Sequence, residues 1–180
     1  MRLVEILISW AKRKYSRRCK IISTIIGIII FLILIPEVIV YFSLKIDELF
    51  GLKFNVKPYS TIVGILLILL GLFISGWASY YLLKLGKGTP LPIAPTQRLV
   101  IAGPYNYCRN PIMLGSIIYY LGLILIVNSL SGILLVIMFE ALYGIYIKFI
   151  EERELELRFG EEYLRYKEKT PFLIPRLRRK

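Results

Sequence analysis

The sequence contains no histidine and only two cysteines among its 180 residues. Because zinc and haem sites usually draw on these side chains, their scarcity argues against a metal centre. Cys19 and Cys108 lie far apart and form no CxxC motif, so neither a disulfide framework nor a thiolate metal site is expected. Acidic residues are also scarce, with 12 Asp and Glu against 24 Lys and Arg.

Hydrophobic residues, by contrast, make up 57% of the chain, and the mean hydropathy is +0.65. These values are typical of a small integral membrane protein. The net charge of +12 does not indicate nucleic-acid binding, because Lys and Arg gather beside apolar runs rather than on one face of a soluble fold. We therefore expect an all-α membrane protein in contact with the lipid bilayer.

Four apolar stretches are long enough to be considered as membrane spans, since one crossing needs roughly 20 helical residues. They are residues 21–44, 59–83, 112–128 and 130–150. The first is too long for a signal-peptide core and lacks a small-residue cleavage site, so we expect it to remain as a span. The turn signal at Asn128–Gly132 predicts a tight helical hairpin.

Residues 1–20 form a separate basic segment, and residues 21–180 a single domain.

Basic residues are distributed unevenly over the segments that flank these spans. Seven precede the first span, three lie between the first two spans, four lie between residues 84 and 109, and ten follow from Lys148 onward. The positive-inside rule then places both termini and the 84–109 segment in the cytoplasm. The two segments richest in polar motifs are thus expected on one side of the membrane.

Two features within the spans have structural interpretations. Gly71, Ser75 and Ser79 recur every four residues and predict close approach of another helix. The aromatic candidates for anchors at the membrane interface, some of which could instead face a substrate groove, are Trp77, Tyr80, Tyr81, Tyr119 and Tyr120.

Two carboxylates lie within the expected spans, where an unpaired charge costs several kcal/mol. Glu37 follows Pro36 near the end of the first span, so it is either an interfacial or a functional residue. Glu140 lies near the middle of the fourth span, ten residues or roughly 15 Å from Ile150. Glu140 is expected either to pair with a cation on a neighbouring helix or to line a substrate cavity.

The segment 84–111 is too rich in Pro and Gly for a helix or regular strand. Because a plain connector needs only a few residues, its length favours a ligand-binding loop. After Lys148 the sequence becomes charged but keeps an apolar helical face, which predicts a cytoplasmic helix and tail over residues 151–180. A carboxylate at the start of this helix is suited to binding an amino group or a ribose hydroxyl.

Six motifs appear in a fixed order between residues 86 and 175. They are Leu99-Val100, Gly103-Pro104-Tyr105, Arg109-Asn110-Pro111 with Gly115, Glu151-Glu152, Phe159-Gly160-Glu161-Glu162-Tyr163, and Tyr166 before Pro171 and Pro175. This set resembles the integral membrane methyltransferases that include isoprenylcysteine carboxyl methyltransferases and phospholipid methyltransferases. Asn110 stands where the isoprenylcysteine enzymes usually have His. Ile147 stands where they have an Arg that binds their substrate, so the resemblance does not extend to prenylated protein.

The resemblance implies S-adenosylmethionine as methyl donor, held between the loop and the acidic helix, and a lipophilic methyl acceptor. Glu151 would bind the polar end of this cofactor. The residues that would line it are Gln97, Arg98, Leu99, Val100, Tyr105, Asn110, Pro111, Ile112 and Met113.

Methyl transfer from a sulfonium needs mainly alignment of the reacting atoms. A carboxylate or thiolate acceptor needs no base, whereas an amine or hydroxyl would need one, for which Glu152 and Glu140 are candidates. Arg109 and Arg158 are expected either to orient an anionic substrate or to pair with Glu151 and Glu152. The alternatives are an NADPH-dependent membrane reductase with a similar core and a non-enzymatic membrane module. The sequence leaves the oligomeric state open.

Overall fold

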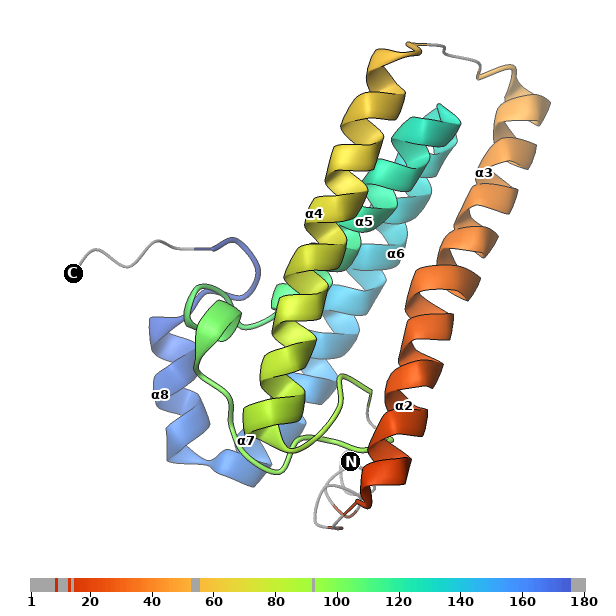
Figure 1. Ribbon diagram of the computed structural model, residues 1–180. Helices are drawn as coiled ribbons and strands as arrows, with labels where there is room; N and C mark the ends of the chain where they lie inside the picture. Colours follow the sequence, from red (N-terminus) through yellow and green to blue (C-terminus); the bar gives the residue numbers. More distant parts are fainter. Residues whose placement is uncertain (1–8, 10–12, 14, 53–55, 92, 176–180) are drawn as a thin grey trace.

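A computed structural model describes residues 9, 13, 15–52, 56–91 and 93–175. These residues form an all-helical bundle with a lateral arm, and none of them lies in a regular strand (Figure 1). The α-helices are α2 (Arg17–Ile29), α3 (Ile35–Phe50), α4 (Tyr59–Tyr81), α5 (Pro111–Val127), α6 (Leu130–Tyr146), α7 (Glu152–Phe159) and α8 (Glu161–Lys169). Three π-helical segments continue them, namely η1 (Ile30–Leu34), η2 (Leu82–Gly86) and η4 (Ile147–Glu151), and η3 (Gly103–Asn106) is a 3-10 turn.

Among the described residues, three continuous helices are long and apolar enough to cross a membrane, namely Arg17–Phe50, Tyr59–Gly86 and Leu130–Phe159. The expected third span, residues 112–128, corresponds to α5, which has only 17 residues and a length of roughly 25 Å. It is shorter than a typical hydrocarbon core of about 30 Å. The helix expected from residue 151 continues the fourth span directly, because η4 joins α6 to α7 without interruption. The tight turn is confirmed: α5 ends at Val127 and α6 begins at Leu130.

Helices α4 and α5 pack along their length through glycines. A Cβ atom on Gly71 would lie 2.6 Å from the carbonyl oxygen of Gly115, and one on Gly64 would lie 2.6 Å from that of Gly122. Ser75 also contacts Gly115, which confirms the Gly71–Ser75 part of the small-residue stripe. Such close backbone approach is possible only because these positions carry no side chain.

The first long helix is distorted near Pro36, which has no N–H group to donate to the carbonyl of Leu32. The hydroxyl of Tyr119 donates to that carbonyl at 3.0 Å, and the hydroxyl of Tyr120 donates to the carbonyl of Phe31 at 2.8 Å. These tyrosines therefore satisfy backbone groups of another helix.

At the end of the bundle that holds the α5–α6 turn, Asp47 of α3 caps α6. Its Oδ2 accepts a hydrogen bond from Ser129 Oγ at 2.5 Å, and its Oδ1 accepts one from Ser131 N at 3.0 Å. Because the first N–H groups of a helix lack internal partners, a carboxylate placed there joins α3 firmly to the hairpin.

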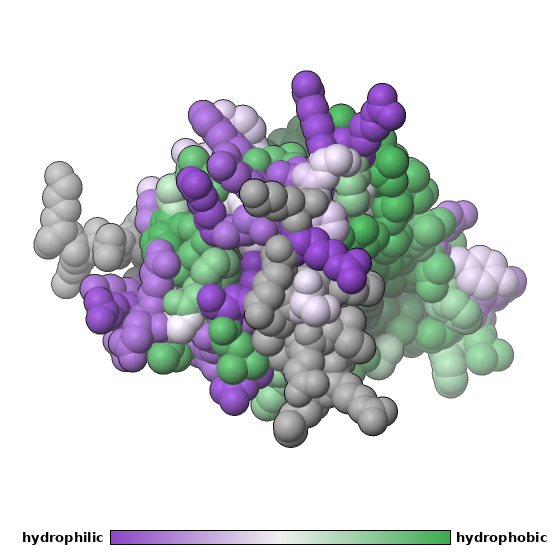
Figure 2. All heavy atoms as spheres, turned by 90° about the horizontal axis from the view of Figure 1, so that it is seen from below, coloured by the Kyte–Doolittle hydropathy of each residue, from purple (hydrophilic) through white to green (hydrophobic). Residues whose placement is uncertain are grey.

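At the opposite end lie the start of α2, the loop after η2, the start of α5, and helices α7 and α8 (Figure 1). The loop folds back against α2 through a hydrogen bond of 2.8 Å between Ser23 and Thr89. Seen from this end, hydrophilic side chains gather over the loop and the C-terminal helices, while hydrophobic ones cover the shaft (Figure 2). The two motif-bearing segments therefore share one polar end of an apolar bundle.

Candidate functional site

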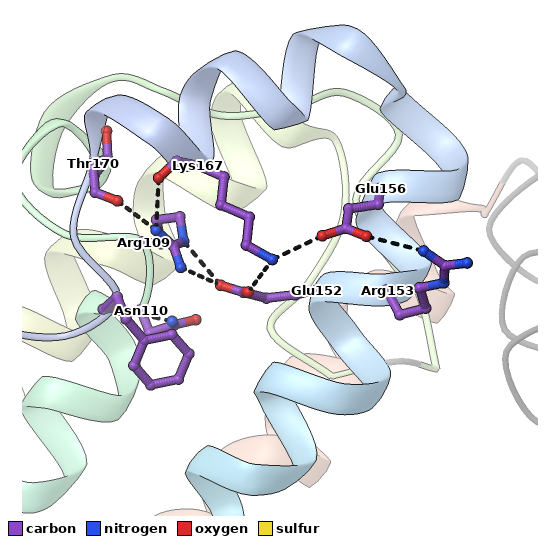
Figure 3. A network of polar contacts seen from close by, with 8 residues as sticks. Arg109, Asn110, Glu152, Arg153, Glu156, Lys167 and Thr170 are labelled. Atoms are coloured by element: carbon purple, nitrogen blue, oxygen red, sulfur yellow. Dashed lines mark hydrogen bonds and ion pairs between the residues drawn. The ribbon is translucent and has the colours of Figure 1, made fainter.

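Arg109 joins the two motif-bearing segments. It lies just before α5, and its Nε and Nη2 atoms approach Oε1 of Glu152, at the start of α7, at 2.9 and 2.7 Å (Figure 3). Both side chains are nearly inaccessible, with exposed fractions of 10% and 2%. The expected ion pair between Arg109 and the glutamate pair is thus confirmed for Glu152.

A second cation completes this network. Lys167 of α8 places its Nζ 2.9 Å from Oε2 of Glu152 and 2.8 Å from Oε1 of Glu156. The hydrogen bonds that Lys167 donates to Glu156 and Glu152 raise the pKa of Lys167 above its ordinary value. Arg153 approaches Glu156 at 3.3 Å from the solvent side (Figure 3). Both carboxylate oxygens of Glu152 are therefore compensated by positive charge.

Arg109 also holds the chain that follows α8. Its Nη1 donates to the carbonyl oxygens of Lys167 at 3.0 Å and Thr170 at 2.5 Å. Beside it, the side-chain amide of Asn110 donates to the carbonyl oxygen of Phe172 at 3.0 Å. The backbone N–H of Arg109 donates to the carbonyl oxygen of Pro171 at 2.9 Å. The Arg-Asn-Pro motif thus fixes the segment 170–172, which we call the C-terminal strap, across the start of α5.

Glu151 precedes Glu152 but has a different environment. It makes no hydrogen bond or ion pair with any residue that the structure describes, and its side chain is half-buried. Tyr105 lies close by: burial raises its pKa well above the ordinary value, and the Glu151 carboxylate raises it further. The pKa of Tyr163 is also raised, by burial and by Glu152 and Glu151, while Arg109 lowers it. A carboxylate without a partner thus lies beside buried aromatic rings.

The residues expected to line the cofactor fall into three groups. Val100 and Tyr105 form a buried cluster with Ala78 of α4, against which Ile112 packs. Asn110 and Pro111 begin α5, with Met113 buried one turn later.

The third group lies further along the loop. The backbone N–H groups of Gln97 and Arg98 donate to the carbonyl of Gly86 at 2.6 and 3.3 Å, and Leu99 follows them half-buried. The Arg98 side chain is exposed. The structure therefore brings Val100, Tyr105 and Ile112 together and leaves the Arg98 side chain outside this cluster.

Arg158 does not bind the Glu151–Glu152 pair. Its Nη1 lies 2.6 Å from Glu154 Oε1, and its Nη2 donates to the carbonyl of Thr96 in the loop. Glu154 and Arg158 are four residues apart and therefore lie on one helix face, whereas Glu152 lies on another. The sequence expectation for an Arg158 pair with the glutamate motif is wrong, and Arg158 instead connects α7 to the loop.

Glu140 lies in α6, eleven residues or roughly 16 Å before Glu151. It is 4% exposed, and Ser116 Oγ of α5 donates to its Oε1 at 2.8 Å. Its Oε2 has no hydrogen-bond partner among the described residues. Of the two alternatives expected for Glu140, the cationic partner is wrong, because its partner among the described residues is a serine hydroxyl.

The structure thus combines an apolar bundle with a polar end at which Arg109 joins the two motif-bearing segments. Residues 59–162, more than half of the chain, match the model of the phospholipid methyltransferase family, and the chain belongs to that family. No curated protein and no solved structure matches the sequence. The matched segment runs from α4 to the start of α8 and contains both motifs that Arg109 joins.

Proposed function

We propose that the protein transfers a methyl group from S-adenosylmethionine to a lipophilic acceptor held in the membrane. The observation that supports this most directly is the unpartnered carboxylate of Glu151 beside the buried ring of Tyr105. A carboxylate in such a site is suited to binding an ammonium group or a pair of hydroxyls, and the cofactor carries both. Val100 and Ile112 pack in the apolar cluster that contains Tyr105, and we place the adenine ring against the edge of this cluster. The residues present therefore fit this cofactor.

When bound, S-adenosylmethionine supplies a methyl group already activated by the sulfonium, so the protein has mainly to orient the reactants. Arg109 contributes by position rather than by contact with substrate, because its Nε, Nη1 and Nη2 atoms are all engaged within the protein. Glu152 is equally engaged and is poorly placed to accept a proton. For an amine or hydroxyl acceptor, Glu140 remains the candidate base, since one of its oxygens is free among the described residues.

Thermal unfolding of the purified protein tests the cofactor. A ligand present at a hundred times its Kd stabilises the folded state by about 2.7 kcal/mol, which for a chain of this size corresponds to a rise in Tm of roughly 5–10 °C. We expect this rise with S-adenosylhomocysteine for the wild type and for Glu168→Gln, an exposed control on α8. Glu151→Gln should lose most of it, while its Tm without ligand should be no lower than that of the wild type.

Two outcomes would contradict the proposal. A rise in Tm with NADPH but not with S-adenosylhomocysteine would favour a reductase. No rise with either ligand, in a protein with helical circular dichroism and a cooperative transition, would favour a non-enzymatic module. If the rise is found, transfer of a radiolabelled methyl group to a membrane lipid extract then identifies the acceptor as carboxylate, thiol, amine or hydroxyl.

We further propose that the polar end of the bundle faces the cytoplasm, in accordance with the excess of basic residues there. Cys19, at the start of α2, is partly exposed, whereas Cys108 is 1% exposed. A membrane-impermeant maleimide should therefore label Cys19 in inverted vesicles and not in right-side-out ones. The reverse pattern would place the site on the other side, and Cys19→Ser provides the background.

A further inference from the structure

Helix α3 has a lipid-facing seam that no other part of the described bundle covers. It buries Pro36, Ile39, Ser43 and Asp47 toward α5 and α6. On another face, Leu34 at the end of η1 is followed by Glu37, Tyr41 and Leu44 of α3 at spacings of three, four and three residues, and all four are exposed. This alternation is the pattern of a coiled-coil interface. Helix α3 lies at the edge of the bundle (Figure 1).

Glu37 is an unexpected residue for such a position. It lies seven residues, or roughly 10 Å, before Leu44 at the end of the apolar run. Helical side chains lean toward the N-terminus of their helix, which here directs the carboxyl group deeper into the membrane and away from the nearer interface. Glu37 has no hydrogen-bond or ion-pair partner within the described parts of the chain. A carboxyl group facing hydrocarbon is strongly unfavourable, so this face requires a polar partner.

Tyr41 supplies the complementary group on the same seam. It lies one helical turn after Glu37 and is 59% exposed, and its ring contacts the neighbouring Phe42 at 5.5 Å between centroids. Because its side chain also leans toward the N-terminus, its hydroxyl extends toward the level of Glu37. One face thus offers a hydrogen-bond acceptor and a donor within a single turn, and it is complementary to a copy of itself.

We propose that the protein forms a parallel homodimer through this seam, with the carboxyl group of Glu37 in each copy bound by the Tyr41 hydroxyl of the other. A two-fold axis along the membrane normal keeps both copies in the same orientation and makes the two contacts equivalent. One polar position within an otherwise apolar seam fixes the register of the two helices. The interface lies on α3, away from the candidate site, so it is independent of the proposed function.

Disulfide cross-linking in native membrane vesicles tests the interface. In a Cys19→Ser background, Leu44→Cys places a thiol on the seam, and Leu66→Cys places one on the lipid face of α4 at an exposure of 61% as the matched control. Oxidation should produce a covalent dimer from Leu44→Cys and not from Leu66→Cys. Equal cross-linking from both positions, or none from the seam, would overturn the proposal.

The polar contacts are tested in the same Leu44→Cys protein. Glu37→Leu and Tyr41→Phe should each reduce the cross-linking rate at least tenfold. The rate of the double variant should fall no further than that of either single variant, because both substitutions remove the same contact. Glu37→Gln should retain most of the rate, since an amide still accepts a hydrogen bond. An undiminished rate in Glu37→Leu would refute the contact. An unchanged Tm for each variant establishes that the fold is intact.

Discussion

Removal of the Arg109 side chain gives the sharpest test of how the site is built. Arg109→Met would leave the carboxylate of Glu152, which is 2% exposed, with Lys167 as its remaining cation. Breaking one side of a buried ion pair costs about 3–5 kcal/mol. Because Lys167 still compensates part of the charge, we expect a loss near the lower end, about 3 kcal/mol. The carbonyls of Lys167 and Thr170 also lose their donor, which should release the C-terminal strap.

The assay is thermal unfolding in detergent, followed by tryptophan fluorescence. For a chain of this size, 1 kcal/mol corresponds to roughly 2–4 °C, so Arg109→Met should lower the Tm by about 6–12 °C. Arg109→Lys keeps the charge but not the forked geometry, and we expect an intermediate loss. The matched control is Arg165→Met on α8, whose pair with Glu161 spans 3.7 Å at the surface and should contribute almost nothing.

A double-mutant cycle decides whether the contact with Glu152 is the cause. Combined with Glu152→Gln, the effect of Arg109→Met should fall well below its effect in the wild type, because the charge it compensates is gone. Additive effects, or a loss in Arg109→Met no larger than in Arg165→Met, would refute this reasoning. The stability of the site would then have to come from the strap contacts or from packing alone.

Three further predictions concern other parts of the molecule. Tyr120→Phe should cost about 1 kcal/mol in the same unfolding assay, because it leaves a backbone carbonyl of the first span without its donor. Gly115→Ala should destabilise by about 1–3 kcal/mol through contact with Ser75, while Gly76→Ala, which would meet nothing within 4 Å, should be neutral. Because the pKa of Lys167 is raised in the folded protein, its stabilising effect is complete below its ordinary pKa of 10.5 and is lost as the pH rises through the raised value. The Tm deficit of Lys167→Met should therefore stay constant up to about pH 10.5 and shrink above it.

Much of the bundle follows from hydrophobic patterning alone. The apolar runs predicted the helices and the turn at Asn128, because long uncharged segments in a membrane can satisfy their backbone only as helices. The partners of Tyr119 and Tyr120 were not predictable in this way. Their role depends on Pro36, more than eighty residues earlier, and only the folded bundle shows which backbone carbonyls the distortion leaves free.

The sequence predicted which residues belong to the site better than it predicted which of them form ion pairs with one another. Arg109 and Glu152 were expected together, since both motifs fall on one side of the membrane. Lys167, the third member of the network, had no signal beyond being a basic residue on a helix. The Arg158–Glu154 pair did have a signal in the sequence, because the two residues are four apart and therefore lie on a single helix face. The neighbouring Glu151-Glu152 motif suggested a different partner for Arg158.

The π-helical segment Ile147–Glu151 explains why neighbouring glutamates differ so strongly in environment. A π turn inserts an additional residue into the helix and therefore rotates all that follows relative to α6. Glu152, the first residue of α7, is turned toward Arg109 and Lys167, whereas Glu151, the last of the π turn, remains beside Tyr105. With Glu152 neutralised by two cations, Glu151 retains an uncompensated carboxylate in a half-buried setting. Such a group is unfavourable for folding by itself and favourable for capturing a cationic or hydroxylated ligand, so the arrangement is better explained by binding than by stability.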